Sequence, residues 1–216
     1  MAILKITVKS KDQKKVGRIF TAKIIELALA NYPGWFSKDS IGSGDPFILY
    51  WPALIESKYI KEKVHINNKT IDIIPTNQMG FEAVTYDKNL PNIPEYEEID
   101  VKEIYFGRLM GTRSGDKGGC ANLGVWTKTN QAYSFLYHYL TVDRLKILLP
   151  DLKNYEIDRY VFSNMNALNF YVHGILGDGA SSNTRLDALA KSLGEYLRAK
   201  KILVPNYIIE ANKKDH

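Results

Sequence analysis

The pattern of apolar and polar residues changes twice within the first thirty positions. Residues 4–9 read Leu-Lys-Ile-Thr-Val-Lys, the alternation of a half-buried strand. From about Lys14 to Ala30 the apolar residues recur at the helical period, and the pair Pro33-Gly34 follows. The start of the chain therefore predicts a strand and then an amphipathic helix.

Residues 32–100 have a different character, rich in glycine, proline and aromatic residues. Within them, residues 64–66 and 71–73 predict two short strands joined by an Asn-Asn-Lys turn. The stretch 88–100 contains two prolines and a run of acids, which is typical of a surface linker. We place the boundary between two halves there, giving segments 1–100 and 101–216. The aromatic residues Trp35, Tyr50 and Trp51 favour a core or interface role.

The second half alternates strands and helices. Its pattern predicts strands at 101–110 and 120–127, a glycine-rich loop between them, two adjacent strands at 156–163 and 167–176, and a last strand at 201–205. Residues 132–140 fit strand and helix equally. Thr141 is a typical N-cap for a helix that Pro150 closes, and a second helix has its apolar face from Leu186 to Leu197. The fold class is α+β, an antiparallel sheet with helices on one face.

The amino-acid composition and charge argue against several classes of function, among them binding to nucleic acid and to membranes. The chain has 216 residues, 45% of them hydrophobic, and one cysteine, so it can bury a core and has no internal disulfide. Its net charge is +5, but the lysines are scattered among acids, which favours a solvated surface over a nucleic-acid interface. With no signal-peptide pattern and no long apolar run, we expect a cytoplasmic protein bound neither to nucleic acid nor to a membrane.

The stretch "RSGDKGG", residues 113–119, is the first candidate site. Its glycine spacing matches neither a Walker A motif nor a dinucleotide fingerprint. Glycine nevertheless lets several backbone N–H groups converge on one anion. Arg113 offers a planar fork for phosphate or carboxylate, Lys117 adds a point charge, and Asp116 could orient them or act as a base. The alternative is a hairpin loop whose charges face water.

The second candidate spans residues 166–187. Gly177 and Gly179 form a flexible loop that we expect to open directly onto a helix, whose N-terminus would favour an anion. Asp178 is poorly placed for an anionic ligand, and Arg185 and Asp187 would project from different sides of that helix. Asn169 lies inside a predicted strand, where a buried amide needs partners. The alternative is an ordinary helix cap with surface ion pairs.

Other reactive side chains give weaker signals. Cys120 could form a nucleophile pair with His138 or His173, but free cysteines are more often small buried apolar residues. The four histidines are isolated from one another and from the cysteine, so we predict no metal site and no cofactor.

Together these motifs resemble the C-terminal domain of the acyclic terpene utilisation (AtuA-like) family. That domain shows an arginine followed by Ser-Gly-Asp-Lys-Gly and Ala-Asn-x-Gly, then Leu-Asn-Phe, a glycine loop and Arg-x-Asp. Two positions depart from the pattern: Asp178 replaces a glycine, and Cys120 replaces a small or hydroxyl residue. The matching positions are Arg113, Ser114, Gly115, Asp116, Lys117, Gly118, Ala121, Asn122, Gly124, Leu168, Asn169, Phe170, Leu176, Gly177, Gly179, Arg185 and Asp187.

The resemblance implies a ferredoxin-like domain associated with acyl-CoA intermediates of branched-acid or terpenoid catabolism. Residues 1–36 resemble only the end of the family's large N-terminal domain, so a split or shortened member, a larger partner subunit and an oligomer are expected. A hydratase- or lyase-like enzyme would use Asp116, Lys117 and His173 in catalysis; the alternative is a non-catalytic assembly subunit. The expected binding residues for an acyl-CoA or other anion are Arg113, Ser114, Gly115, Gly118, Asn122, Asn169, Gly177, Gly179, Arg185 and Asp187.

Overall fold

The computed structural model describes residues 3–28, 30, 32–37, 42–73 and 92–214. Within it, residues 3–10 have no regular secondary structure. The strand expected at residues 4–8 is therefore wrong. The alternation is present in the sequence, but a strand also needs a hydrogen-bonded neighbour, and the described part of the chain offers residues 4–8 none.

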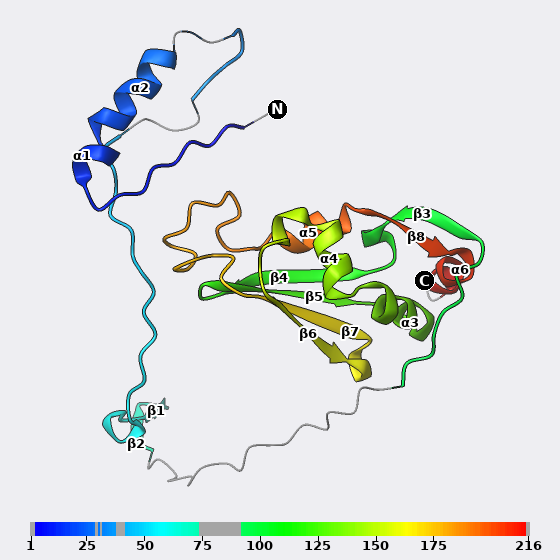
Figure 1. Ribbon diagram of the computed structural model, residues 1–216. Coiled ribbons are helices and arrows are strands. Elements are labelled where there is room, and N and C mark those ends of the chain that lie inside the picture. The colour runs from blue at the N-terminus through cyan, green and yellow to red at the C-terminus, as the bar shows by residue number, and fades with distance from the viewer. Residues whose placement is uncertain (1–2, 29, 31, 38–41, 74–91, 215–216) are drawn as a thin grey trace.

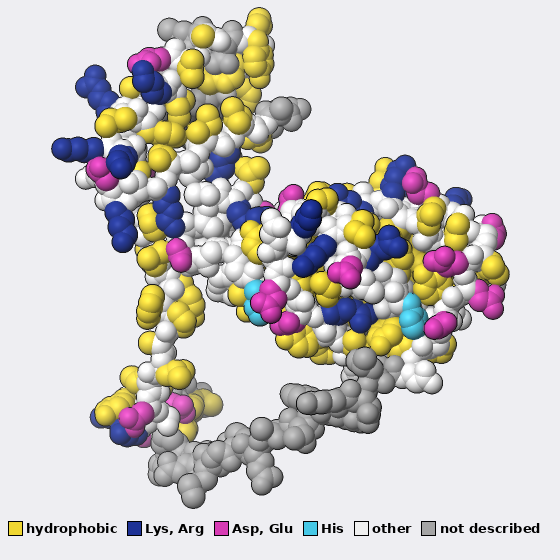
Figure 2. All heavy atoms as spheres, viewed as in Figure 1, with side chains coloured by type: hydrophobic (Ala, Val, Ile, Leu, Met, Phe, Trp, Pro, Cys, Tyr) yellow, Lys and Arg dark blue, Asp and Glu magenta, His cyan; other side chains and the backbone are white. Residues whose placement is uncertain are grey.

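The helix predicted after this segment is confirmed, but it is divided into two helices. Helix α1 spans Gln13–Val16 and α2 spans Arg18–Ala28, with Gly17 between them. Neither helix has a buried side chain, and Ile19 and Leu27 of α2 are each 66% exposed. The apolar side chains of this N-terminal part remain on the surface among lysines and arginines, as Figure 2 shows.

The predicted hairpin is confirmed. Strands β1 (Lys63–Ile66) and β2 (Lys69–Asp72) pair antiparallel. Asn67 and Asn68 make the turn with φ values of 46° and 61°, a conformation that asparagine adopts more readily than most residues. The linker predicted at 88–100 begins outside the described residues, but Ile93 and Tyr96 pack against the core of the following domain.

The remainder of the chain forms an α+β domain, as predicted. One antiparallel sheet has the strand order β4-β5-β7-β6, and a second pairs β3 with β8. Helices α3, α4 and α5 lie over one face of the four-stranded sheet (Figure 1). The elements are β3 (Val101–Tyr105), β4 (Gly111–Lys117), β5 (Cys120–Trp126), α3 (Asn130–Tyr139), α4 (Val142–Leu148), β6 (Ile157–Phe162), β7 (Ala167–Val172), α5 (Leu193–Arg198), β8 (Lys201–Pro205) and α6 (Asn206–Lys214).

The two central strands place alternate side chains on opposite faces of this sheet. Leu123 and Val125 of β5 and Leu168 and Phe170 of β7 are at most 1% exposed and form the core beneath the helices. No helix of the described residues covers the opposite face (Figure 1), and Trp126 on that face is 42% exposed. The period-two pattern therefore defines one buried face and one open face.

Residues 132–140, which fit both patterns, are helical. The Thr129 side chain accepts a hydrogen bond from the amide of Ala132 and caps α3. The predicted N-cap of α4 is confirmed, because the Thr141 side chain accepts from the amide of Arg144. Burial of Phe135 and Leu136 on the sheet decides the ambiguous pattern in favour of a helix.

Two expectations for the glycine-rich regions were wrong. Residues 111–117 are not a loop but strand β4, paired along its full length with β5. The helix expected from Leu186 begins only at Leu193, because Ala190 has a φ of 51°, which a helix cannot accommodate. Leu186 is accordingly 77% exposed. Helix α6 was not predicted.

Candidate functional site

The two glycine regions meet backbone to backbone. Gly118 and Gly119 form the turn between β4 and β5, and the carbonyl oxygen of Gly119 accepts a hydrogen bond of 2.9 Å from the amide of Leu176. A β-carbon added to Gly119 would lie 2.1 Å from the carbonyl oxygen of Gly177. Segments almost sixty residues apart in the sequence are thus one structural unit, and only glycine fits at position 119.

A surface depression of about 540 Å³ lies where these loops meet. We call it the glycine-loop hollow. It is lined by Tyr50, Pro52, Lys117, Gly118, Gly119, Gly177 and Asp178. Its volume falls in the range of small-molecule sites, about 300–1,000 Å³.

The backbone around the hollow has hydrogen-bonding capacity left over. Gly118 and Gly177 have φ values of 61° and 57°, which turn the chain sharply and favour glycine. Within the described residues, the amide N–H groups of Gly118, Gly119 and Asp178 donate no hydrogen bond. Lys117 is exposed, and among the described residues its ammonium donates only to the carbonyl of Asp116, at 3.1 Å. Free amides beside a lysine form an environment suited to an anion.

A segment of the N-terminal half completes the hollow. The Ser181 hydroxyl donates a 2.7 Å hydrogen bond to the carbonyl of Ile48. The Lys9 ammonium lies 3.6 Å from the Asp178 carboxylate, and that of Lys5 donates to the carbonyl of Arg185. These contacts hold Tyr50 against the glycine loops, with its β-carbon 3.8 Å from a β-carbon built on Gly179.

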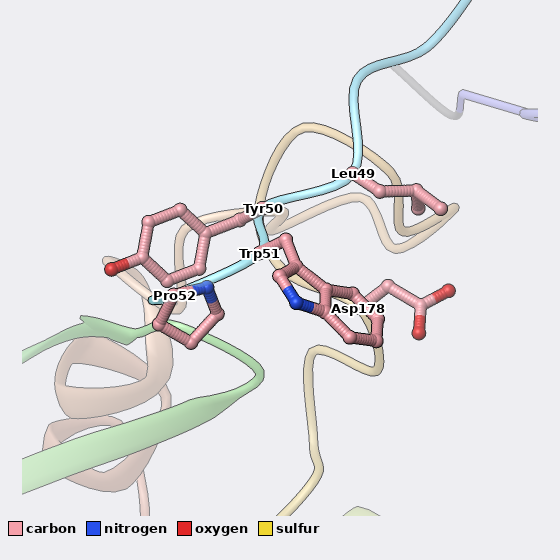
Figure 3. A pocket seen from close by; sticks show the side chains of 5 residues that line it. All are labelled: Leu49, Tyr50, Trp51, Pro52 and Asp178. Carbon is pink, nitrogen blue, oxygen red and sulfur yellow. The ribbon is translucent and has the colours of Figure 1, made fainter. Parts of the chain in front are cut away.

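A second depression of about 370 Å³ adjoins the first, and we call it the aromatic hollow. It is lined by Leu49, Tyr50, Trp51, Pro52 and Asp178. Figure 3 shows the rings of Tyr50 and Trp51 on either side of the backbone, with Asp178 beside the indole. Tyr50, Pro52 and Asp178 line both hollows, which are therefore neighbouring parts of one surface.

Four of the predicted site residues lie close to the segment that leads into α5. The Ser114 hydroxyl accepts from the amide of Gly194 at 2.9 Å and donates to the carbonyl of Lys191 at 3.2 Å. Asp187 accepts from the amide of Lys191, whose ammonium lies 4.0 Å from Asp116. A β-carbon on Gly115 would lie 3.1 Å from that same ammonium. These residues brace the start of α5 and do not line the hollows.

Another group lies on the open face of the sheet. Arg113 is exposed, and its side chain has no hydrogen bond or ion pair within the described residues. Beside it, the Asn122 amide donates to the side-chain oxygen of Asn169 at 3.3 Å across β5 and β7. Asn169 is half-buried and its side-chain oxygen is partnered, but neither asparagine lines a hollow.

At the end of this face are several titratable groups. His173 Nε2 lies 2.8 Å from the Asp158 carboxylate, and its ring contacts the Tyr171 ring edge to face. The hydrogen bond with Cys120, more than burial, raises the pKa of the Tyr171 hydroxyl above its usual value. His173 and Asp116, two of the three predicted catalytic residues, therefore belong to separate groups, and neither lines the hollow with Lys117.

The structure thus brings Lys117, Gly118 and Gly177 together and places Gly179 at their margin. Arg185 lies in the loop before α5 and not on a helix, with its amide donating to Asn183. The pattern analysis missed Pro52 and assigned Tyr50 and Trp51 to a core or interface. The departure of Asp178 from the family pattern was the one available signal for its position at both hollows.

Two further observations concern ligands and membranes. Among the residues that the structure describes, no group of three or more His, Cys, Asp or Glu side chains could hold a metal ion. Nor is any helix in that part of the chain long and apolar enough to cross a bilayer.

The antiparallel sheet with helices on one face defines an α+β domain of the ferredoxin-like class. Residues 105–203, just under half of the chain, match the family model of the AtuA ferredoxin-like domain. This match agrees with the resemblance that the motifs of the segment indicated. Searches of curated proteins and of solved structures found no match.

Proposed function

We propose that this chain is a subunit of an acyl-CoA-processing enzyme, hydratase- or lyase-like, that binds the anionic part of its substrate at the glycine-loop hollow. The observation that supports this most is the packing of Gly119 on Gly177, which places two glycine turns and Lys117 around one depression. Unbonded amides and a flexible ammonium can together hold a phosphate that moves little during the reaction.

The chemistry itself needs groups beyond the hollow. A hydratase adds the elements of water across a carbon–carbon double bond, with hydroxide forming the new C–O bond and a proton going to the neighbouring carbon. Asp116 and His173 lie outside both hollows. We propose that a larger partner subunit covers this end of the domain and either supplies the acid–base groups or closes the substrate onto Asp116.

Binding of CoA thioesters tests this proposal. We expect a saturated and an α,β-unsaturated thioester to raise the unfolding temperature of the full chain. Lys117→Ala should weaken binding roughly tenfold, since it removes a hydrogen bond to a charged group. Lys102→Ala is the matched control, because it removes the same charge from β3, a strand that lines neither hollow. No binding by any thioester, alone or with the partner subunit, contradicts the proposal.

A non-catalytic assembly subunit is the second candidate function. The exposed apolar side chains of α2, such as Ile19 and Leu27, favour it, since such surfaces mark interaction sites. Light scattering of the purified chain decides between an oligomer and a monomer. A chain that binds its partner but no thioester supports this second function.

A further inference from the structure

One residue of the candidate site does not suit an anion. Asp178 lines both hollows and is 67% exposed at its side chain. A carboxylate repels phosphate, and Lys9 at 3.6 Å compensates it only in part. A carboxylate is, however, a strong hydrogen-bond acceptor for hydroxyl and amino groups. Its position therefore indicates a ligand that carries such groups next to its anionic part.

The aromatic hollow indicates a further part of that ligand, in addition to its anionic part and its hydroxyl or amino groups. Four of its five lining residues are apolar or aromatic: Leu49, Tyr50, Trp51 and Pro52. Trp51 is 87% exposed and Tyr50 is 64% exposed, although aromatic side chains normally bury their rings. An exposed indole beside a depression offers a face on which a planar ring can stack.

From these two features we infer that the joined hollows bind a purine nucleoside diphosphate moiety, with the base on Trp51, the ribose 2′-hydroxyl on Asp178 and the diphosphate at Lys117 and the glycine turns. Such a ligand has the base at one end, the diphosphate at the other and the sugar between them; Trp51 lines only the aromatic hollow and Lys117 only the glycine-loop hollow. Asp178 is shared by both hollows, as the ribose is shared between base and phosphates.

This inference rests on the proposed function, because it names the portion of the substrate that the hollows recognise. It also assigns a role to the N-terminal half. The segment Ile48–Pro52 is held to the second glycine loop by the hydrogen bond from Ser181. Trp51 is then a specificity-determining residue supplied from outside the ferredoxin-like domain.

Calorimetry on the full chain tests the inference. The probes are ADP and inorganic pyrophosphate, and no divalent cation is present. The two probes carry similar charge, so the ratio of their affinities reports on the base and ribose. We expect ADP to bind about tenfold more tightly than pyrophosphate, since stacking on an aromatic side chain commonly contributes this much. Trp51→Ala should remove the difference and leave pyrophosphate binding unchanged.

Two variants complete the design. Asp178→Gly should strengthen pyrophosphate binding, because it removes a negative charge, and should lower the ratio of ADP to pyrophosphate affinity. Trp35→Ala is the matched control, since this tryptophan belongs to the same N-terminal half but lines neither hollow. Because Trp51 is so exposed, its loss leaves the fold intact.

The outcomes separate this inference from the proposed function. Equal affinities for ADP and pyrophosphate, with Lys117→Ala weakening both, overturn the purine inference and leave the anion site standing. Preference for ADP that depends on Trp51, without binding of any CoA thioester, supports the inference and contradicts the thioester assignment. Failure of ADP, pyrophosphate and thioesters alike overturns both.

Discussion

Gly119 and Gly177 lie so close that a single β-carbon on the first would meet the carbonyl oxygen of the second at 2.1 Å. Real β-carbons do not approach an oxygen this closely, so the contact exists only because residue 119 has no side chain. The two positions favour glycine for different reasons: residue 119 because of the loop that it faces, and residue 177 because of its own positive φ of 57°.

Gly119→Ala should therefore separate the two loops. The added methyl group forces the backbone at Gly177 to move, because that oxygen is part of the main chain. We expect the free energy of unfolding to fall by about 1–3 kcal/mol, the usual cost of overpacking, and ligand binding at the hollow to weaken with it. Thermal unfolding and calorimetry measure the two effects. Gly42→Ala is the control, since a β-carbon there has open space around it; equal effects of the two variants contradict this account.

The second prediction compares the effects on stability of substitutions at two neighbouring hydroxyl residues, Ser114 and Thr112. Both are buried on β4, at 5% and 7% exposure, but only Ser114 accepts a hydrogen bond from the buried amide of Gly194. Ser114→Ala leaves that amide without a partner and should cost about 1–3 kcal/mol. The Thr112 hydroxyl has no partner within the described residues, so Thr112→Val should be neutral or stabilising. Urea unfolding compares the two; a larger loss for Thr112→Val would be inconsistent with this assignment.

Alkaline pH should weaken the attachment of the linker to α3. Burial, followed by the neighbouring Glu98, raises the pKa of Tyr96 from 10.0 to about 12. The folded state thus holds this proton more tightly than the unfolded state does. The stabilisation is fully present below pH 10 and is lost as the pH rises towards 12.

Tyr133 and Tyr139 also have pKa values that burial raises, so Tyr96→Phe should remove part of this decline in stability and not all of it. Chemical unfolding between pH 9 and about pH 11.5 measures the slope. Tyr32→Phe, which changes a tyrosine 70% exposed on the N-terminal half, should leave the slope as it is. An unchanged slope in Tyr96→Phe refutes the assignment.

Deletion of residues 1–73 should leave the ferredoxin-like domain folded. Helices α1 and α2 contribute no buried side chain, and the ion pair of Lys9 with Asp178 is largely exposed, which limits its contribution to about 1 kcal/mol or less. We expect the unfolding temperature to change by no more than about 5 °C. A loss of cooperative unfolding would instead place part of the domain's core in the first 73 residues.

Much of the domain's fold could be predicted from the sequence, because its buried side chains recur with the period of the strand or helix that contains them. In β5 and β7 every second residue is buried, and the threonine caps of α3 and α4 act within one turn of their own positions. Such signals are local, and the structure keeps them.

The errors arose where distant contacts override local patterns. The stretch 113–117 contains glycines typical of a loop, yet its register with β5 makes it a strand. Leu186 and Leu189 have helical spacing, but the Asp187 carboxylate accepts hydrogen bonds from the amides of Lys191 and Ser192, which form a turn before α5. The same limit applies to the candidate site. Its glycines could be predicted from the sequence, but the approach of Trp51 to Asp178 could not, because no local pattern connects positions so far apart in the chain.

The hydrogen bond from Ser181 to Ile48 joins residues 133 positions apart, and this separation has a consequence for biosynthesis. The ribosome delivers the aromatic segment first, and the second glycine loop follows it only 133 positions later. Until then Tyr50 lacks its contact with Gly179, and the aromatic segment remains open to chaperones or to a partner protein. The hollow can therefore form only after the second glycine loop has been synthesised, long after the aromatic segment.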